Sequence, residues 1–565
     1  MGETKPGLFA REATGLVREV GFMLGVIIIM SHVVGLGWQK RAFQFTGPRP
    51  VPTDQLPLGL PAIFWAFLIC GILVMITGYA AGYVTAAMPR SGGGYVTISR
   101  VIHPVVGYNA GWLMFLAEAF SYGLIGVAVF EAVMIFYNIA LAPTVVFFDA
   151  TTLFIGGVVI IIIFTALALF GVRLYGWLMH VMFWPTLVIT IAFFAMWIAG
   201  AMDPSVVAKG VETVMEAPVS TFNTLAVDSG MTEPANIATF YDAFSYALAG
   251  SFWAYMGWYS VTFIAGEVKE ANKKLPMVVL FSGFIIMLIY LGASSFSAIS
   301  TLGVETFTDA AGHEWSFFQS YSWLSYGPLT DAQIAARDAA IPNFQAAWST
   351  GIASLISRGM GLGWLSWLIA FAGVVWLAND IPPFLLVASR TMFAMSFDRM
   401  MPEKLAEVSE RWHSPTWSLI ITGIFGIIGC IAESNVGGLG EYTAFAGVVG
   451  TDIYDAVFLT LFCVSCMLLP LERKEIYDRA AVKHSVGTVV GFGAIATLAA
   501  GYCLFTFVKE SIGFIFTPAS TGDLASSIGF WGCIAVGILL YIYYMYRNTT
   551  KGIDMRTLYI SIPPE

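Results

Sequence analysis

The sequence predicts an all-α integral membrane protein with about twelve transmembrane helices. Of its 565 residues, 58% are hydrophobic and 11% are charged, whereas ordinary soluble domains are roughly 45–50% apolar and about 25% charged. Apolar stretches of about 20 residues, long enough to cross the hydrocarbon core of a bilayer, recur along the whole chain. The charged residues fall almost entirely between these stretches. The lipid bilayer is therefore the expected surrounding of most of the chain.

Twelve spans follow from reading the apolar runs between polar breaks. They cover residues 20–38, 61–87, 106–140, 152–171, 175–200, 239–266, 275–301, 362–396, 416–433, 443–469, 485–508 and 526–546. The first span follows a segment with three basic residues and carries no evident cleavage signal, so we expect it to be retained as an anchor.

Lys and Arg residues predict which side of the membrane each connection occupies. An even number of spans places both termini on one side, and 20 of the 27 Lys and Arg residues fall on that side, with the other seven opposite. Because basic residues concentrate in cytoplasmic loops, we expect a plasma-membrane protein with both termini in the cytoplasm. The predicted organisation is a cytoplasmic N-terminal segment (1–19), spans 1–5 (20–200), an extracellular loop (201–238), spans 6–10 (239–469) with a long extracellular loop (302–361), a cytoplasmic loop (470–484), spans 11–12 (485–546) and a cytoplasmic tail (547–565). The two long outer loops are interpreted as partial lids or as solvated connectors, with a helix expected at 344–357.

The sequence gives no support for several kinds of chemistry. All six cysteines lie in apolar stretches, where we expect them to pack as small hydrophobic residues rather than to form disulfides. The three glycines at 92–94 are no phosphate loop, because no Gly-Lys-Ser/Thr follows them. No metal-spaced His/Cys set or nucleophilic Ser/His/Asp arrangement stands out. We therefore expect no enzyme activity, no cofactor and no nucleic acid partner.

Glycines interrupt two of the predicted spans at corresponding places in the two halves of the chain. Span 1 contains Gly35-Leu36-Gly37, and span 6 contains Gly250 and Gly257 among large aromatic residues. Unwound backbone is tolerated at membrane depth only where it is buried in protein or lines a cavity. Paired interruptions therefore predict two broken helices that line a binding site.

Four sets of residues stand in the order and at the spacing of a known permease pattern. They are Leu-x-Arg-x-x-Gly at 16–21 with Val-Val-Gly-x-Gly at 33–37, Pro-x-Ser-Gly-Gly-x-Tyr at 89–95, Gly-Glu-Val-Lys at 266–269 after the aromatic-rich 252–257, and Ser-Arg at 389–390 followed by Met-Pro at 401–402. These motifs resemble those of the amino acid–polyamine–organocation superfamily of permeases. The resemblance implies the five-plus-five inverted-repeat fold of the leucine transporter, with spans 1 and 6 broken and two added C-terminal spans. This chain departs from the family at Asp398-Arg399, where Asp-Gly is usual, and at Ala271, where proline is usual.

The break in span 1 predicts the substrate site. Unwinding at Gly35-Leu36-Gly37 frees backbone amides at the N-terminus of a half-helix, where partial positive charge suits a carboxylate. The resemblance implies that Val34 and this glycine segment hold the carboxylate of an amino acid.

Span 6 is expected to supply the rest of that site. The resemblance implies that backbone carbonyls near Phe252 and Ala254 accept from the substrate ammonium group, and that Trp253 is an aromatic gate over the substrate. Cation–π contact with an ammonium group is available to such a gate, and ordinary packing is the alternative. Tyr255 and Gly257 belong to the same predicted site.

Ionisable residues within spans are costly in hydrocarbon and indicate a pathway or a pairing role. Glu118 is interpreted either as a contact for a cationic substrate or as the partner of a histidine. His32 lies three residues before the break and is either a proton relay or a core histidine. The remaining ones are Glu131, His180, Asp452 and Asp455, and we expect Glu131, His180 and one of the two aspartates near span ends, solvated at the interface.

Asp380 is expected at mid-membrane, because it precedes the cytoplasmic Arg390 by ten residues, or about 15 Å of helix. The resemblance places this position at the cation site of the family, beside the carbonyls of Ser31 and Val34. A carboxylate there either ligates Na⁺ or loads and releases a proton. The alternative is a structural hydrogen bond, to His32 or Asn379.

We therefore expect a secondary transporter that moves amino acids across the cell membrane by alternating access, as a proton- or sodium-coupled symporter. Transport of polyamines or other amines, and exchange of one amino acid for another, are the alternatives within the superfamily. A non-transporting membrane receptor or sensor is the alternative from another class. The expected partners are a small-molecule substrate and the bilayer, and the oligomeric state stays open.

Overall fold

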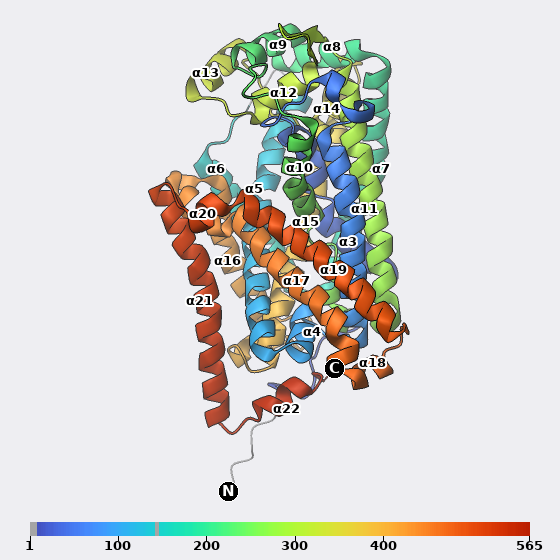
Figure 1. Cartoon of the computed structure of the whole chain (residues 1–565), viewed down its shortest axis with the longest axis vertical. Coiled ribbons are helices and arrows are strands. Elements are labelled where there is room, and N and C mark those ends of the chain that lie inside the picture. The colour runs from blue at the N-terminus through green and yellow to red at the C-terminus, as the bar shows by residue number, and fades with distance from the viewer. Residues whose placement is uncertain (1–7, 142–145, 565) are drawn as a thin grey trace.

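The computed structural model describes residues 8–141 and 146–564, and helices make up most of it. The first half of the chain forms α1 (Phe22–Val33), α2 (Leu36–Gln44), α3 (Ala62–Ala87), α4 (Gly94–Val101), α5 (Pro104–Leu141), α6 (Ala150–Ala168) and α7 (Gly171–Met202), with two short 3₁₀ turns, η1 (Thr53–Gln55) and η2 (Pro57–Gly59). The long helices stand roughly side by side along the longest axis of the molecule (Figure 1).

The second half repeats this pattern of long helices. It forms α10 (Phe240–Tyr255), α11 (Ala271–Leu302), α15 (Gly363–Phe397), α16 (Thr416–Ser434), α17 (Val448–Glu472), α18 (Lys474–Arg479), α19 (Val486–Glu510), α20 (Ile512–Phe516), α21 (Thr521–Thr550) and α22 (Met555–Ile560), with 3₁₀ turns η3 (Ser260–Phe263), η4 (Ala265–Glu267), η5 (Glu403–Ala406), η6 (Val436–Gly438) and η7 (Glu441–Ala446). The predicted all-α membrane fold class is confirmed, whereas the inverted-repeat relation between the halves stays a prediction.

The two long loops predicted outside the membrane are largely helical. They form α8 (Pro204–Met215), α9 (Val219–Asp228), α12 (Phe317–Tyr326), α13 (Asp331–Ala340) and α14 (Ser349–Gly359), with a two-stranded antiparallel hairpin of β1 (Phe307–Thr308) and β2 (Glu314–Trp315). The expected helix at 344–357 begins five residues later, at Ser349. Nearly all of α14 is buried, and it packs on α7, α8 and α15. This segment is therefore part of the packed bundle and no solvated connector.

The molecule has two distinct ends. α8, α9, α12 and α13 gather at one end, which we call the capped end, and α4, α18 and α22 lie at the other, which we call the terminal end (Figure 1). Both ends of the described chain reach the terminal end, since Ala10 N donates to Phe397 O and Arg90 Nε donates to Pro563 O. This arrangement agrees with an even number of crossings, and the cytoplasmic side of the terminal end stays a prediction.

Eleven helical segments of the described residues are long and apolar enough to cross a membrane. The broken pair α1 and α2 counts among them as one segment, Phe22–Gln44. The sixth of the twelve predicted spans, at 239–266, is instead a 16-residue helix, α10, followed by two 3₁₀ turns. This difference follows from the predicted break, because α10 stops where the chain unwinds.

Burial separates the central helices from the peripheral ones. α5 packs against α15, α16, α17 and α21, and most of its 38 residues are buried. By contrast, large apolar side chains of α6, α7 and α19 are exposed, among them Ile162, Ile191 and Leu498. Contiguous exposed apolar surface of this extent fits contact with lipid. α5 and α15 therefore form the middle of the bundle, where a binding site would be shielded from lipid.

Ion pairs close the terminal end of the bundle. Arg100 of α4 donates to both carboxylate oxygens of Asp398, at 2.6 and 2.8 Å, and the Tyr95 hydroxyl donates to the same carboxylate at 2.7 Å. Burial works against the charge of Arg100, but the attraction of Asp398 outweighs it and raises the pKa of Arg100. Arg100 therefore stays charged throughout the physiological range.

The family departure at Asp398-Arg399 has a local explanation. Arg399 has a φ of +60°, in the left-handed region that glycine adopts most easily. Its guanidinium donates to Glu403 at 2.7 Å and to the Phe9 carbonyl at 2.9 Å. These bonds hold arginine in a conformation for which the family usually uses glycine.

Candidate functional site

Two helices are interrupted midway, as predicted. α1 ends at Val33 and α2 begins at Leu36, so the unwound stretch is shorter than expected. α10 ends at Tyr255, and the chain turns away at Gly257, whose φ of +94° favours glycine. The expectation for Gly250 is wrong: this residue lies within α10, packed against the ring of Phe45. Gly250 therefore serves close packing, and Gly257 marks the break.

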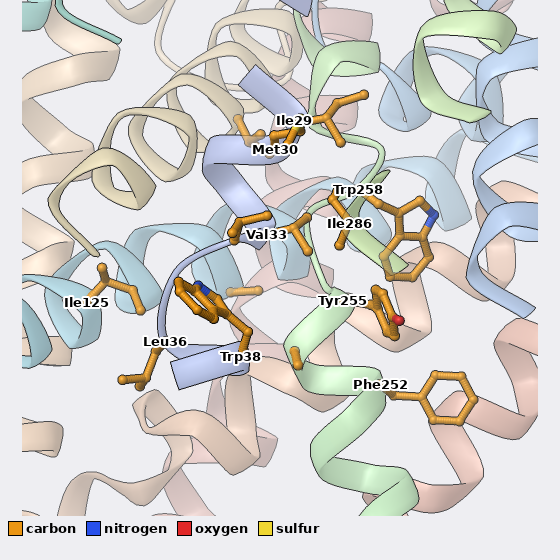
Figure 2. Packing of buried hydrophobic residues seen from close by; sticks show 14 of the residues in the cluster. Ile29, Met30, Val33, Leu36, Trp38, Ile125, Phe252, Tyr255, Trp258 and Ile286 are labelled. Atoms are coloured by element: carbon orange, nitrogen blue, oxygen red, sulfur yellow. The ribbon is translucent and has the colours of Figure 1, made fainter. Parts of the chain in front are cut away.

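The two breaks lie against each other. A β-carbon added to Gly37 would come within 2.6 Å of Ala254 Cβ, so α2 and α10 touch at this point. The hydroxyl of Tyr290, on α11, lies within hydrogen-bond distance of the Val33 carbonyl and 2.7 Å from the Ala254 carbonyl. Figure 2 shows Val33 and Leu36 beside the first break and Tyr255 on the neighbouring helix. One tyrosine thus reaches a carbonyl beside each break.

A cavity opens between the broken helices and α5, α15 and α17. Its volume is about 580 Å³, including the part that is open to solvent. A cavity of this size suits a small organic molecule. Its walls are formed by His32, Val33, Leu36, Gly37, Ala117, Glu118, Ser121, Leu124, Ile125, Trp253, Ala254, Met256, Gly257, Asp380, Phe384, Thr451, Asp452 and Asp455.

Eight of the residues predicted for the site line this cavity. They are His32, Leu36, Gly37, Glu118, Trp253, Ala254, Gly257 and Asp380. Gly35 lies directly behind the wall, where an added β-carbon would overlap the Asp380 carboxylate. Spans 1, 3, 6 and 8 of the sequence therefore converge on one site.

Four other predicted residues lie outside the cavity wall and make structural contacts. Ser31 Oγ accepts from Asn379 Nδ2 at 2.7 Å, and the Tyr255 hydroxyl donates to the Phe67 carbonyl at 3.0 Å. The ring of Phe252 faces Tyr502 of α19 at 6.1 Å, and Val34 is buried. Their roles in binding stay predictions, and any contribution from these residues would come through their backbone.

Four carboxyl groups and one histidine face the cavity. His32 Nε2 lies 3.3 Å from Glu118 Oε2, so Glu118 has the histidine partner that was one of its two expected roles. The Tyr259 hydroxyl donates to Asp455. No Lys or Arg is among the lining residues in the part of the chain that the structure describes. The cavity wall is therefore acidic.

Asp452 and Asp455 correct an expectation from the sequence. One of the two was expected to be solvated near a span end, but only 8% of the surface of Asp452 and 6% of that of Asp455 is exposed, and both line the cavity. The reason is that α17 begins at Val448, so both residues lie in its first two turns on the side that faces α5. Their spacing of three residues, which puts them on one helix face, was the available signal.

Asp380 lies in a part of α15 where two prolines interrupt the backbone hydrogen bonds of the helix. Pro382 and Pro383 have no N–H, so the carbonyls four residues earlier, of Ala378 and Asn379, lack their usual helical donor. Asp380 Oδ1 and Asn379 Oδ1 accept no hydrogen bond from the described chain. The alternative bond from Asp380 to His32 or Asn379 is absent within the same residues, since His32 Nε2 lies beside Glu118 and Asn379 donates to Ser31. Several oxygens thus gather beside the break in span 1.

Arg41, on α2, is a functional candidate that sequence analysis missed. Its guanidinium carbon lies 3.8 Å from the ring centroid of Trp253, the residue expected to gate the site. Its Nη1 donates to Gln44 Oε1 at 2.5 Å, and only 7% of the residue is exposed. Arg41 therefore holds Trp253 at the edge of the cavity through cation–π contact.

Tyr290→Phe is expected to lower substrate uptake about tenfold while the protein stays folded. The phenylalanine ring would keep the contacts with Phe67 and Tyr255. Loss of the hydroxyl removes a donor from the carbonyls of Ala254 and Val33, of which Val33 also accepts from Gly35 N, and an unpaired buried carbonyl costs about 1–3 kcal/mol. Uptake per folded protein, measured in proteoliposomes, checks this expectation.

Tyr175→Phe is the matched control, because the Tyr175 hydroxyl is buried and bonds nothing in the described residues. Equal uptake by the two variants would contradict a positioning role for Tyr290.

Comparison with known proteins decides the family. The family model of amino acid permeases matches residues 26–540, nearly the whole chain. The chain belongs to the amino acid permease family. The predicted superfamily is thereby confirmed, as is the expectation that the protein is a transporter-family member rather than an enzyme.

Individual relatives of this permease are distant. It is 24% identical to the b(0,+)-type amino acid transporter 1 of Mus musculus over 270 residues, 47% of this chain and 48% of the relative. It is 22% identical to the branched-chain amino acid permease BcaP of Bacillus subtilis over 303 residues, 54% of this chain and 50% of the relative. An uncharacterised transporter of Mycobacterium tuberculosis is 21% identical over 449 residues, 79% of this chain and 81% of the relative. The permease thus spans about half the length of the first two relatives.

Proposed function

We propose that this permease moves amino acids across the cell membrane by alternating access, driven by a proton or sodium gradient. The observation that carries the proposal is the meeting of two broken helices at one cavity. The N-terminus of α2 opens on this cavity at Leu36 and Gly37, where free amides and the helix dipole suit a substrate carboxylate. The names of the amino acid transporters that resemble the chain support the same substrate class.

The acidic wall complements the other end of an amino acid. Glu118 of α5 and Asp452 and Asp455 of α17 line the same cavity as the N-terminus of α2. An ammonium group between them would be attracted from several sides in a site shielded from bulk water. The cavity therefore offers backbone amides to a carboxylate and carboxyl groups to an ammonium group.

Asp380 is the proposed coupling residue. Its oxygen Oδ1 has no donor in the described chain, and the carbonyls of Ala378 and Asn379, which lack their usual helical donor, lie on the same helix turn. Such oxygens suit a hard cation such as Na⁺, and the carboxyl group alone would carry a proton. Among the described residues no cluster of three or more His, Cys, Asp or Glu is arranged for a metal ion, so carbonyl and hydroxyl oxygens would complete a sodium site.

Asp380→Asn is expected to abolish gradient-driven accumulation, because the amide neither exchanges a proton nor carries the charge that balances Na⁺. Proteoliposomes with an imposed proton gradient, sodium gradient or no gradient, and with pooled labelled amino acids outside, measure this. Asp228→Asn is the control, since Asp228 is an exposed carboxylate at the end of α9. Unchanged ion dependence in Asp380→Asn would refute the coupling role.

A second candidate substrate class is favoured by the same acidic wall. Four carboxyl groups, with no Lys or Arg beside them among the described lining residues, suit a diamine or a dibasic amino acid better than a neutral one. Competition of the labelled uptake by leucine, lysine and putrescine separates these classes. Uptake only into preloaded vesicles would indicate exchange, and binding without uptake would indicate a receptor.

The plasma membrane is the proposed location, with the terminal end of the bundle in the cytoplasm. The excess of Lys and Arg in the connections of that end supports this orientation.

A further inference from the structure

A second cavity lies at the terminal end, far along the bundle from the acidic site. It is lined by Ser99, Arg100, Ile102, His103, Pro104, Arg473, Tyr541, Met545, Met555, Arg556, Tyr559 and Ile560. Three arginines and a histidine face this space, and no Asp or Glu is among the lining residues of the described chain. Apart from its tyrosines, the ionisable side chains that line it are therefore basic, whereas four of the five that line the first cavity are acidic.

The lining cations come from separate elements of the fold. Arg100 lies on α4, His103 precedes α5, Arg473 follows α17, and Arg556 lies on α22. Two of them are held in place by protein contacts: Arg100 by Asp398, and Arg473 by Glu475 and by the carbonyls of Arg100 and Ile560. His103 and Arg556 are exposed. The fixed pair thus forms the back of the cavity, and the exposed pair forms its rim.

One wall of this cavity is apolar and belongs to a helix at the edge of the bundle. Tyr541 and Met545 of α21 and Met555 of α22 line it. The neighbouring residues Leu539, Ile542 and Tyr546 are 64%, 57% and 72% exposed, as expected for a lipid-facing surface. α21 stands at the side of the bundle, and α22 runs from its foot toward α4 and α18 (Figure 1). The cavity therefore adjoins both the lipid-facing surface and the polar end of the molecule.

We propose that this cavity binds the phosphate group of an anionic ligand, with a phospholipid headgroup as its source. Basic pockets between helices at the cytoplasmic side suit such headgroups, and guanidinium groups pair with phosphate oxygens in a bidentate manner. The acyl chains would lie along Tyr541 and Met545, and the phosphate would lie between His103 and Arg556. Since α22 supplies one wall, the bound ligand would fasten α22 to α4 and to the end of α17.

Thermal unfolding of the purified protein in neutral detergent tests this site. The probes are dioleoyl phosphatidylglycerol, dioleoyl phosphatidylcholine and soluble glycerol 3-phosphate. Phosphatidylglycerol is expected to raise the unfolding midpoint by about 2 °C or more, and phosphatidylcholine is expected to leave it unchanged. Arg556→Gln is expected to lose this shift while keeping the midpoint of the wild type without lipid, because its side chain is exposed.

Arg479→Gln is the matched control, since Arg479 is an exposed arginine at the same end that does not line the cavity. It is expected to keep the full shift. An equal shift with glycerol 3-phosphate would support the phosphate site and assign its ligand to free phosphate esters. A full shift in Arg556→Gln, an equal loss in Arg479→Gln, or no shift in the wild type would overturn the proposal.

Discussion

Gly37→Ala is expected to reduce transport between tenfold and about a hundredfold. The added methyl group would lie 2.6 Å from Ala254 Cβ and 2.9 Å from Ala254 Cα, and a backbone atom cannot rotate away. Overpacking of this kind costs about 1–3 kcal/mol, and each 1.4 kcal/mol corresponds to about a factor of ten. The strain falls at the contact between the two broken helices, which must stay close for both to face one substrate.

Uptake into proteoliposomes measures this effect, and the unfolding midpoint of each purified variant separates lost transport from lost fold. Gly501→Ala is the control, because a β-carbon at Gly501 would meet no atom within 4 Å. Transport at the wild-type rate by Gly37→Ala, or the same loss in Gly501→Ala, would contradict the placement of the substrate at this contact.

Arg390→Gln is expected to lower the stability of the permease by about 3–5 kcal/mol, because it leaves a buried carboxylate without its partner. Arg390 Nε and Nη2 donate to the two carboxylate oxygens of Glu267, at 2.9 and 3.1 Å. Side-chain exposure is 2% for Arg390 and 0% for Glu267. The pair joins α15 to the turn that follows the broken α10, and Glu267 O also accepts from Val20 N ahead of α1.

The unfolding midpoint in detergent, followed by tryptophan fluorescence, checks this expectation. Lys274→Gln is the control: its ion pair with Glu270 is 45% and 57% exposed, so its loss costs at most about 1 kcal/mol. If both variants unfolded at the wild-type temperature, the Arg390 pair would not be a main support of the terminal end.

The helix breaks could be predicted because a glycine within a membrane span indicates either a break in the helix or close packing against a neighbour. At Gly257 the structure has a positive φ, and at Gly37 it has a helix contact too close for a β-carbon. Each of these features requires a glycine at one position, and that glycine is visible in the sequence. Gly250 carries the same signal with a different cause, since it makes room for the Phe45 ring. A glycine in the sequence therefore does not by itself distinguish a helix break from close packing.

The position of Asp380 midway along α15 was also predictable, and its depth in the membrane stays a prediction. The neighbours of Asp380 were not predictable. Which face of α17 meets α5 depends on packing across the bundle, so the burial of both Asp452 and Asp455 at the cavity was not predicted. Arg41 was missed for the same reason, since its contact is a ring more than 200 positions away in the chain.

The outer loops show the limit of apolar periodicity. α8, α9 and α12 are short helices with mixed composition, and their pattern does not stand out from that of a loop. Their buried side chains, such as Phe222 and Phe317, contact each other, and α12 also packs on α2 and α11 of the bundle. The length of these segments was evident from the sequence, and their packing was not.

Equilibrium binding of labelled amino acids to the purified permease tests the central claim most directly, because it is independent of any gradient. The wild type and Gly501→Ala are expected to bind at least one labelled amino acid saturably, and Gly37→Ala is expected to bind it at least tenfold more weakly. Absence of binding by the wild type across the pooled amino acids, or equal affinity in Gly37→Ala, would contradict an amino acid site at the two helix breaks.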